Sequence, residues 1–211
     1  MDSAAFGDTE LRLFPLKAVL FPGGLMSLTV FENRYLALVT ECARSASAFG
    51  AVAWTARASA GDAQAPAGFA AVGTRAQVLS AEAAAAHTLL VRCRGSARFR
   101  VVSQRQQADG LWTAVVRAVP QDEVRAPPPA LLPTVRALAT TIAKLKGQNA
   151  VPFAMPYEFD DAGWVANRWC EILPIPQDAK QRLMELTDPV VRLQLVNDFL
   201  RQKGVLEPPA L

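Results

Sequence analysis

The chain has 211 residues, of which 51% are apolar, and a net charge of +3, so it can build one large or two small domains around a proper core. No run approaches the roughly 20 apolar residues of a membrane-spanning helix, and the first ten residues resemble no secretory signal. The three cysteines, Cys42, Cys93 and Cys170, form no CxxC pair, which favours a reduced, cytoplasmic setting. A mild basic excess over residues 1–120 falls short of a nucleic-acid footprint.

The opening stretch, residues 11–39, predicts a strand, a turn, a second strand and a helix. Apolar residues alternate with other residues in the two strands, at Leu11 and Leu13, then at Met26, Leu28 and Val30. This period is typical of strands with one buried face. Pro22-Gly23-Gly24 allows a sharp turn between them. Helical spacing of apolar residues then predicts a helix from about Asn33 to Ser47 that packs back on the strands.

The next part of the chain reads as a run of short strands. Strands are predicted at Phe49–Thr55, Gly73–Val78, His87–Arg94, Ala97–Arg105 and Leu111–Val119. A surface loop is predicted for Arg57–Gly68, and a tight turn at Gly95-Ser96. About six strands, mostly in hairpins, with one early helix predict a curled or barrel-like sheet rather than a parallel one.

The proline-rich stretch Pro120–Pro129 ends the strands, and the remainder reads as helical. Four helices are predicted, at about 131–147, 160–173, 178–186 and 188–203. The second of them is expected to start at Asp160-Asp161, Asp188 is the expected N-cap of the fourth, and Gly147 is the expected C-cap of the first. The sequence therefore predicts an α+β protein with a β-rich domain at 10–120 and a helical domain at 130–204.

Five segments along the chain carry recognisable motifs: Leu13-Phe14-Pro15-Leu16, Val19-Leu20-Phe21-Pro22-Gly23, Phe31-Glu32-Asn33-Arg34-Tyr35, Gly95 with Arg98-Phe99-Arg100-Val101, and the stretch Gln181 to Leu193. Together they resemble the Lon protease N-terminal domain family. The third is similar to the family's FEPRY, with Asn33 where proline is usual. The resemblance covers about residues 11–202. It implies a PUA-like β pseudo-barrel with one inserted helix, followed by a C-terminal helical bundle.

Catalytic and metal chemistry have little support in the sequence. The only histidine, His87, has no acid at a recognisable spacing, and one histidine with three scattered cysteines makes a metal site unexpected. The chain also has no GxxxxGK[ST] loop for a nucleotide. In complete Lon proteases, ATP hydrolysis and cleavage belong to an ATPase module and a serine–lysine protease module, which are separate from the N-terminal domain. The resemblance to the N-terminal domain therefore implies no proteolysis by these residues and no cofactor.

Two groups of residues are candidate binding surfaces. The first is an arginine face on a predicted hairpin, formed by Arg92, Arg94, Arg98 and Arg100, which could dock carboxylates or phosphates. The second is a run of apolar side chains in a segment that its prolines keep from forming a helix, at Phe153, Met155, Tyr157 and Phe159. The alternatives are a solvated sheet face for the first group and ordinary packing for the second.

The resemblance implies binding of unfolded or tagged polypeptide segments without catalysis, as an accessory to ATP-dependent proteolysis. A full-length Lon-type protease is the further partner that it suggests. The alternative is an RNA-binding protein, because PUA-like barrels also occur in that class. RNA binding usually places aromatic side chains among the basic ones, and the arginine face has none, so nucleic acid is not the expected partner.

Overall fold

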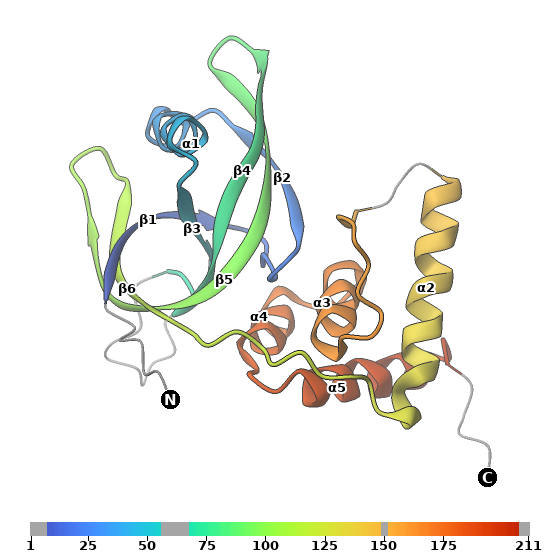
Figure 1. The fold of residues 1–211 in the computed structure, drawn as a ribbon. Helices are drawn as coiled ribbons and strands as arrows, with labels where there is room; N and C mark the ends of the chain where they lie inside the picture. Colours follow the sequence, from blue (N-terminus) through green and yellow to red (C-terminus); the bar gives the residue numbers. More distant parts are fainter. Residues whose placement is uncertain (1–7, 56–67, 149–151, 207–211) are drawn as a thin grey trace. The chain divides into compact units, whose positions relative to one another are not determined.

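The computed structural model describes residues 8–55, 68–148 and 152–206, and it divides into two compact units, residues 1–121 and 122–211 (Figure 1). The first unit holds a six-stranded sheet and one helix, and the described part of the second is helical. The predicted α+β class is therefore confirmed. The predicted loop at Arg57–Gly68 lies almost wholly outside the described residues.

The strands of the first unit curl into a closed sheet. Its elements are β1 (Thr9–Leu16), β2 (Leu25–Val30), α1 (Asn33–Ser45), β3 (Ala48–Ala53), β4 (Val72–Ala85), β5 (Thr88–Gln106) and β6 (Trp112–Ala118). The strand order is β2-β5-β4-β3-β1-β6, and an additional pairing of β5 with β6 closes the sheet into a ring (Figure 1). Among these strands, only β1 and β3 pair in parallel. A parallel pair needs a long connection between its strands, and here β2 and α1 provide that connection.

Strand β5 runs without a break through Gly95 and Ser96, so the tight turn predicted there is wrong. Gly95 serves a close approach of backbones instead: its N–H donates to Gly24 O (2.8 Å), and its carbonyl accepts from Gly23 N (2.9 Å). A Cβ at residue 95 would lie 2.3 Å from Phe21 O. The turn that makes the hairpin lies between β4 and β5, where His87 adopts a positive φ of 54°.

A β-bulge follows directly after Gly95. Ala76 of β4 lies opposite Gly95 and Thr74 lies opposite Arg98, so two residues of β5, Ser96 and Ala97, face the single residue between them on β4. One edge of β5 pairs with β4. The opposite edge pairs with β2 before the bulge and with β6 after it. The bulge is thus the point at which β5 changes partners.

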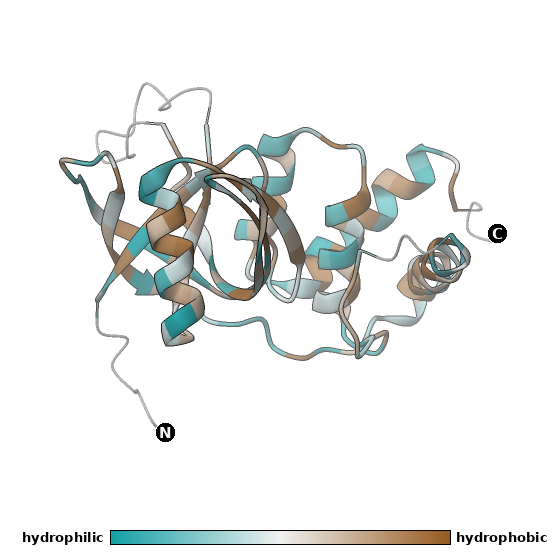
Figure 2. Cartoon of the chain, turned by 90° about the horizontal axis from the view of Figure 1, so that it is seen from above, coloured by the Kyte–Doolittle hydropathy of each residue, from teal (hydrophilic) through white to brown (hydrophobic). Residues whose placement is uncertain are grey.

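Strand β1 is buried on both faces, so the prediction of one buried face is wrong for it. Leu11 and Leu13 belong to one apolar cluster with Val52 and Phe99, whereas Phe14 and Leu16 belong to the cluster that α1 covers. The predicted buried face of α1 is confirmed, at Tyr35, Leu38, Val39 and Cys42. Figure 2 shows α1 with hydrophobic and hydrophilic segments alternating along it, as this one-sided burial requires.

The second unit consists of a short helix and four longer ones in the residues described. They are η1 (Pro129–Leu131), α2 (Leu132–Gly147), α3 (Ala162–Ile172), α4 (Gln177–Glu185) and α5 (Pro189–Gln202). Asp188 accepts from two backbone N–H groups at the start of α5, which confirms the predicted N-cap, and Asp161 does the same at the start of α3. These bonds hold the pKa of Asp188 below its usual value. Gly147 lies inside α2 and Gln148 is the C-cap, so that prediction is wrong.

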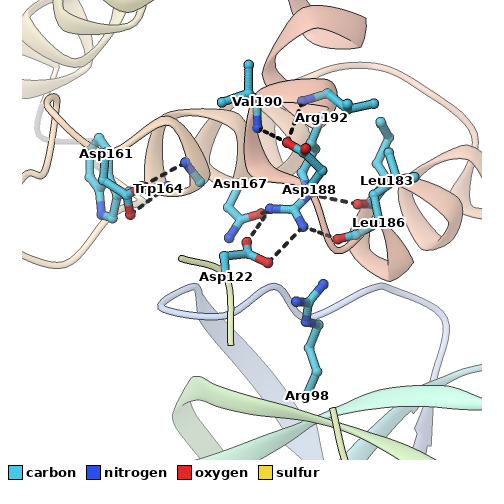
Figure 3. A network of polar contacts seen from close by, with 12 residues as sticks. Arg98, Asp122, Asp161, Trp164, Asn167, Leu183, Leu186, Asp188, Val190 and Arg192 are labelled. Carbon is cyan, nitrogen blue, oxygen red and sulfur yellow. Dashed lines mark hydrogen bonds and ion pairs between the residues drawn. The ribbon is translucent and has the colours of Figure 1, made fainter. Parts of the chain in front are cut away.

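A buried arginine on α5 joins the parts of the second unit (Figure 3). The guanidinium of Arg192 donates to both carboxylate oxygens of Asp122 (2.6 and 3.4 Å) and to Asn167 Oδ1 of α3 (3.1 Å). It also donates to the carbonyls of Leu183 (2.8 Å) and Leu186. Its side chain is 1% exposed, and these contacts engage all three of its nitrogens. Asp122 therefore belongs to the helical unit.

The rest of the predicted linker also packs in part on the helices. Arg125 O accepts from Ala162 N at the start of α3 (2.8 Å), and the Arg125 guanidinium pairs with Asp188 (3.3 Å). The helical unit thus begins at residue 122 rather than 130. That these two parts, predicted at 10–120 and 130–204, are separate domains stays a prediction.

Replacement of Arg192 tests its role in the second unit. We expect Arg192→Met to lower the free energy of unfolding by about 3 kcal/mol or more, because Asp122 would stay behind as a poorly compensated charge. Arg182→Met, on an exposed ion pair with Asp178, is the matched control and should cost under about 1 kcal/mol. Urea unfolding followed by circular dichroism measures both, and equal losses would contradict the assigned role.

Replacement of Gly95 tests the close approach at the bulge. Gly95→Ala should lower the stability of the protein by about 2 kcal/mol or more, because the new methyl group meets backbone rather than a movable side chain. Gly147→Ala has nothing within 4 Å of its new Cβ and should be neutral or stabilising. Calorimetry compares the two, and a neutral Gly95→Ala would show that this contact is not tight.

Candidate functional site

The four arginines predicted to share one face do not do so, because they lie on one strand and the bulge divides them. Residues directly opposite each other on antiparallel strands share a face of the sheet. Arg98 lies opposite Thr74, on the same face as Ala76 and Gly95, whereas Arg94 lies opposite Gln77 on the other face. Arg92 and Arg94 therefore point to one side of β5, and Arg98 and Arg100 to the other. The single arginine face is wrong as a geometric prediction.

Arg98 is built into the first unit. Its side chain is buried and donates to Pro120 O (3.1 Å), and its carbonyl accepts from Val119 N (3.0 Å). These bonds fix the chain as it leaves β6. Arg100 is exposed and lies opposite Arg117. A substrate-binding role for any of these arginines stays a prediction, and Arg98 is the least accessible of them.

Arg92 and Arg94 lie next to β2. Arg94 is opposite Leu25, and Arg92 is opposite Ser27. We name this surface the β2–β5 face, and it comprises Leu25, Ser27, Thr29, Leu90, Arg92 and Arg94. Both guanidiniums are exposed and make no hydrogen bond or ion pair with the residues that the structure describes. The face therefore offers two available positive charges beside the end strand of the sheet.

The second predicted group packs mainly against α3. Phe153 is buried, and the Arg168 guanidinium lies 5.9 Å from the centre of its ring. Tyr157 and Phe159 form an aromatic cluster with Trp164, with ring centres 5.4 to 5.9 Å apart. The packing alternative therefore accounts for these three side chains.

Met155, the fourth member of that group, is 71% exposed. It stands apart from the aromatic cluster and keeps its apolar side chain accessible. A binding role for this group stays a prediction, and Met155 is the member best placed for one.

A depression that the sequence reasoning did not identify lies at the start of α1. It has a volume of about 410 Å³ and is lined by Phe31, Glu32, Asn33, Arg34 and Asp109. Arg34 pairs with Glu32 and donates to Gly110 O (3.2 Å), which ties the start of α1 to the β5–β6 turn. Phe31 is 65% exposed. The Phe31–Tyr35 segment contributed to the family resemblance, but that resemblance did not mark it as a binding surface. The signal for a binding surface is the exposed Phe31 ring beside charged side chains.

The buried thiols and the histidine give no sign of reactivity. Burial raises the pKa of Cys93 to about 11 and that of Cys170 to about 12, so both are protonated at neutral pH. His87 lies exposed in the β4–β5 turn. Among the described residues, no three His, Cys, Asp or Glu side chains gather as metal ligands, and no helix is long and apolar enough to cross a membrane.

Comparison with known proteins identifies the family of this chain. The model of the ATP-dependent protease La (LON) substrate-binding domain matches residues 10–202. The chain belongs to this family. The match covers both units and includes every residue of the surfaces described above.

Solved structures agree with this assignment. A Lon N-terminal domain protein from Xanthomonas campestris has a TM-score of 0.71 and 29% identity, and the match covers 90% of this chain and 98% of that one. The N-terminal domain of the Mycobacterium avium complex Lon protease has a TM-score of 0.62 and 15% identity, covering 92% and 98%, which shows a common fold. No curated protein matches the chain.

The carboxyl group of Glu171, near the end of α3, makes stability depend on pH. Burial raises its pKa to about 7, although Arg168 pairs with it (2.6 Å) and Lys180 donates to its backbone carbonyl (2.9 Å). The folded state therefore holds this proton where the unfolded state, with a pKa near 4.5, has lost it. Stability from this group is full below pH 4.5 and falls as the pH rises towards 7.

Glu171→Gln removes this titration. We expect the stability of the variant relative to the natural chain to increase between pH 5 and pH 8, as measured by urea unfolding at several pH values. Glu185→Gln, at an exposed residue of α4, is the control for loss of one carboxylate. A flat difference for Glu171→Gln would contradict the raised pKa.

Proposed function

We propose that this chain binds unfolded or extended segments of other proteins without cleaving them, as an accessory to ATP-dependent proteolysis. The observation that carries the proposal is the match of residues 10–202 to a family described as a substrate-binding domain. A full-length Lon-type protease is the partner that such a role requires. A cytoplasmic location stays part of the proposal.

The surface of the first unit supports this proposal. Phe31 presents an apolar ring to solvent beside the charged side chains of Glu32 and Arg34. Unfolded proteins differ from folded ones in exposing apolar side chains and unpaired backbone groups. A partly apolar depression with charges at its rim can receive a side chain from such a segment while leaving folded proteins unbound.

RNA binding receives no specific support. The bulge separates Arg92 and Arg94 from Arg98 and Arg100, so these four arginines form no continuous basic face. The β2–β5 face contains no aromatic side chain on which a base could stack. Binding of RNA is therefore an outcome that the following experiment should exclude.

The proposal is tested with one protein in two states. The labelled protein is reduced and alkylated so that it stays unfolded. It should show an increase in fluorescence anisotropy when it is titrated with the chain. The same protein in its native state should not, and neither should a labelled single-stranded RNA. Equal binding of the folded and unfolded forms, or binding of RNA alone, would contradict the proposed function.

Truncation of Phe31 locates the binding. Phe31→Ser should weaken binding of the unfolded protein by about fivefold or more, because an exposed aromatic anchor is worth about 1 to 2 kcal/mol. Its melting temperature should stay within about 2 °C of the natural chain, since the ring is mostly exposed. Val124→Ser, at another exposed apolar residue in the second unit, is the control for loss of apolar surface. Unchanged affinity of Phe31→Ser would exclude the depression.

A further inference from the structure

Strand β2 has a strand partner on one edge only. It pairs with β5, and no other strand in the described residues pairs with it. The remaining strands of the sheet each have strand neighbours on both sides over at least part of their length, through the closure of β5 with β6. An edge of this kind leaves backbone N–H and C=O groups without partners in the sheet and can accept a further strand.

The hydrogen bonds at Gly95 determine which groups of β2 face outwards. The N–H and C=O of Gly95 both point towards β2, where they bond to Gly24 and Gly23. Because these directions alternate along an antiparallel pair, Cys93, Val91 and Leu89 also point their backbone groups towards β2. Their opposite residues, Met26, Leu28 and Val30, bond inwards to β5.

The intervening residues of β2 therefore direct their backbone groups to the open edge. They are Leu25, Ser27 and Thr29. The side chains of Ser27 and Thr29 are exposed, and that of Leu25 is half-buried. Three residues in extended conformation, two positions apart, present three donors and three acceptors in the arrangement that an extended peptide backbone complements.

We propose that the open edge of β2 holds an extended segment of a substrate polypeptide as an added β-strand. This inference rests on the proposed function and specifies its mode of binding. A backbone is the one feature that all unfolded proteins share, so an edge that bonds to backbone needs no particular substrate sequence. The end of β2 leads directly into Phe31, so the added strand extends towards the depression at α1.

The side chains beside this edge favour one pattern of substrate. Arg92 and Arg94 lie on the β2–β5 face, one strand away from the edge, and their long side chains can reach acidic groups on an added strand. On the opposite face, Met26 and Leu28 pack against the apolar cluster under α1. The preferred segment thus alternates acidic and apolar residues. Glu82 lies opposite Leu90 on the same face as the two arginines and moderates this preference.

Amide exchange measured by NMR locates the added strand. The probe is a ten-residue peptide of alternating Val and Glu with blocked ends, and the protein is the full chain. Exchange at Leu25, Ser27 and Thr29 should slow at least tenfold on saturation with the peptide. The amides of Met26 and Leu28 should be protected without it, because they already bond to β5. Binding of the peptide without slower exchange at the three outward amides would overturn the inference.

Two pairs of variants provide a second readout. Ser27→Pro removes an outward N–H and leaves the inward ladder intact, so it should weaken peptide binding at least tenfold, whereas Ser27→Ala should keep it. Replacement of Glu by Lys in the peptide should weaken binding to the natural chain more than to Arg92→Gln/Arg94→Gln. Full binding by a folded Ser27→Pro overturns the inference; if that variant fails to fold, the exchange experiment on the natural chain decides.

The outcomes separate this inference from the proposed function. Peptide and unfolded protein that both bind without protection at β2 would remove the added strand and leave polypeptide binding in place. Failure of both ligands to bind would remove the proposed function as well. Protection of the outward amides that rises with protein concentration in the absence of peptide would assign the edge to a second copy of this chain, and would overturn the inference.

Discussion

Strand β5 has β4 along one edge from Thr88 to Arg100, but its other edge carries β2 before the bulge at Ser96-Ala97 and β6 after it. The close approach of Gly95 to Gly23 and Gly24 holds β2 in place at this junction. The extra residue turns β5 and reverses which residues face each side of the sheet. One local irregularity thereby closes the ring with β6, leaves β2 with an open edge, and separates the four arginines into two pairs.

The helical unit depends on a different kind of constraint. Arg192 is buried, and five hydrogen bonds to four residues satisfy its guanidinium, so those residues must keep their places for the charge to be tolerated. Thr134 donates to Asn197 (2.9 Å) and its carbonyl accepts from the Trp169 indole (3.1 Å), which joins α2, α3 and α5 in the same way. Such polar contacts specify one arrangement of helices whose apolar stripes alone would permit several.

The sequence was sufficient for features set by local chemistry. The cap at Asp188 and the helix start at Asp160-Asp161 follow from short side chains before helical periodicity, and the buried face of α1 follows from its spacing. It was insufficient where the outcome depends on distant strands. A Gly-Ser pair is typical of a turn, and only the proximity of Phe21 O shows that Gly95 serves close packing instead. The arginine face failed for the same reason, since the alternation used to predict it does not continue through a bulge.

The candidate site was predicted only in part. The aromatic side chains after α2 were identified, but their packing against Trp164 could not be derived from their own spacing. The depression at Phe31 and the open edge of β2 had no signal of their own, because both follow from the strand order rather than from any motif. The family resemblance predicted polypeptide binding, and the topology is the basis for the proposed place of binding.

In the proposed binding mode, the first unit holds polypeptide in extended form along β2. Nuclear Overhauser effects between isotope-labelled protein and unlabelled peptide give a direct test, because they report distances between backbone protons of the two chains. We predict contacts between the α-protons of Met26 and Leu28, which point to the open edge, and α-protons of the peptide. Peptide contacts confined to side chains elsewhere on the protein, with none to the backbone of β2, would contradict the account.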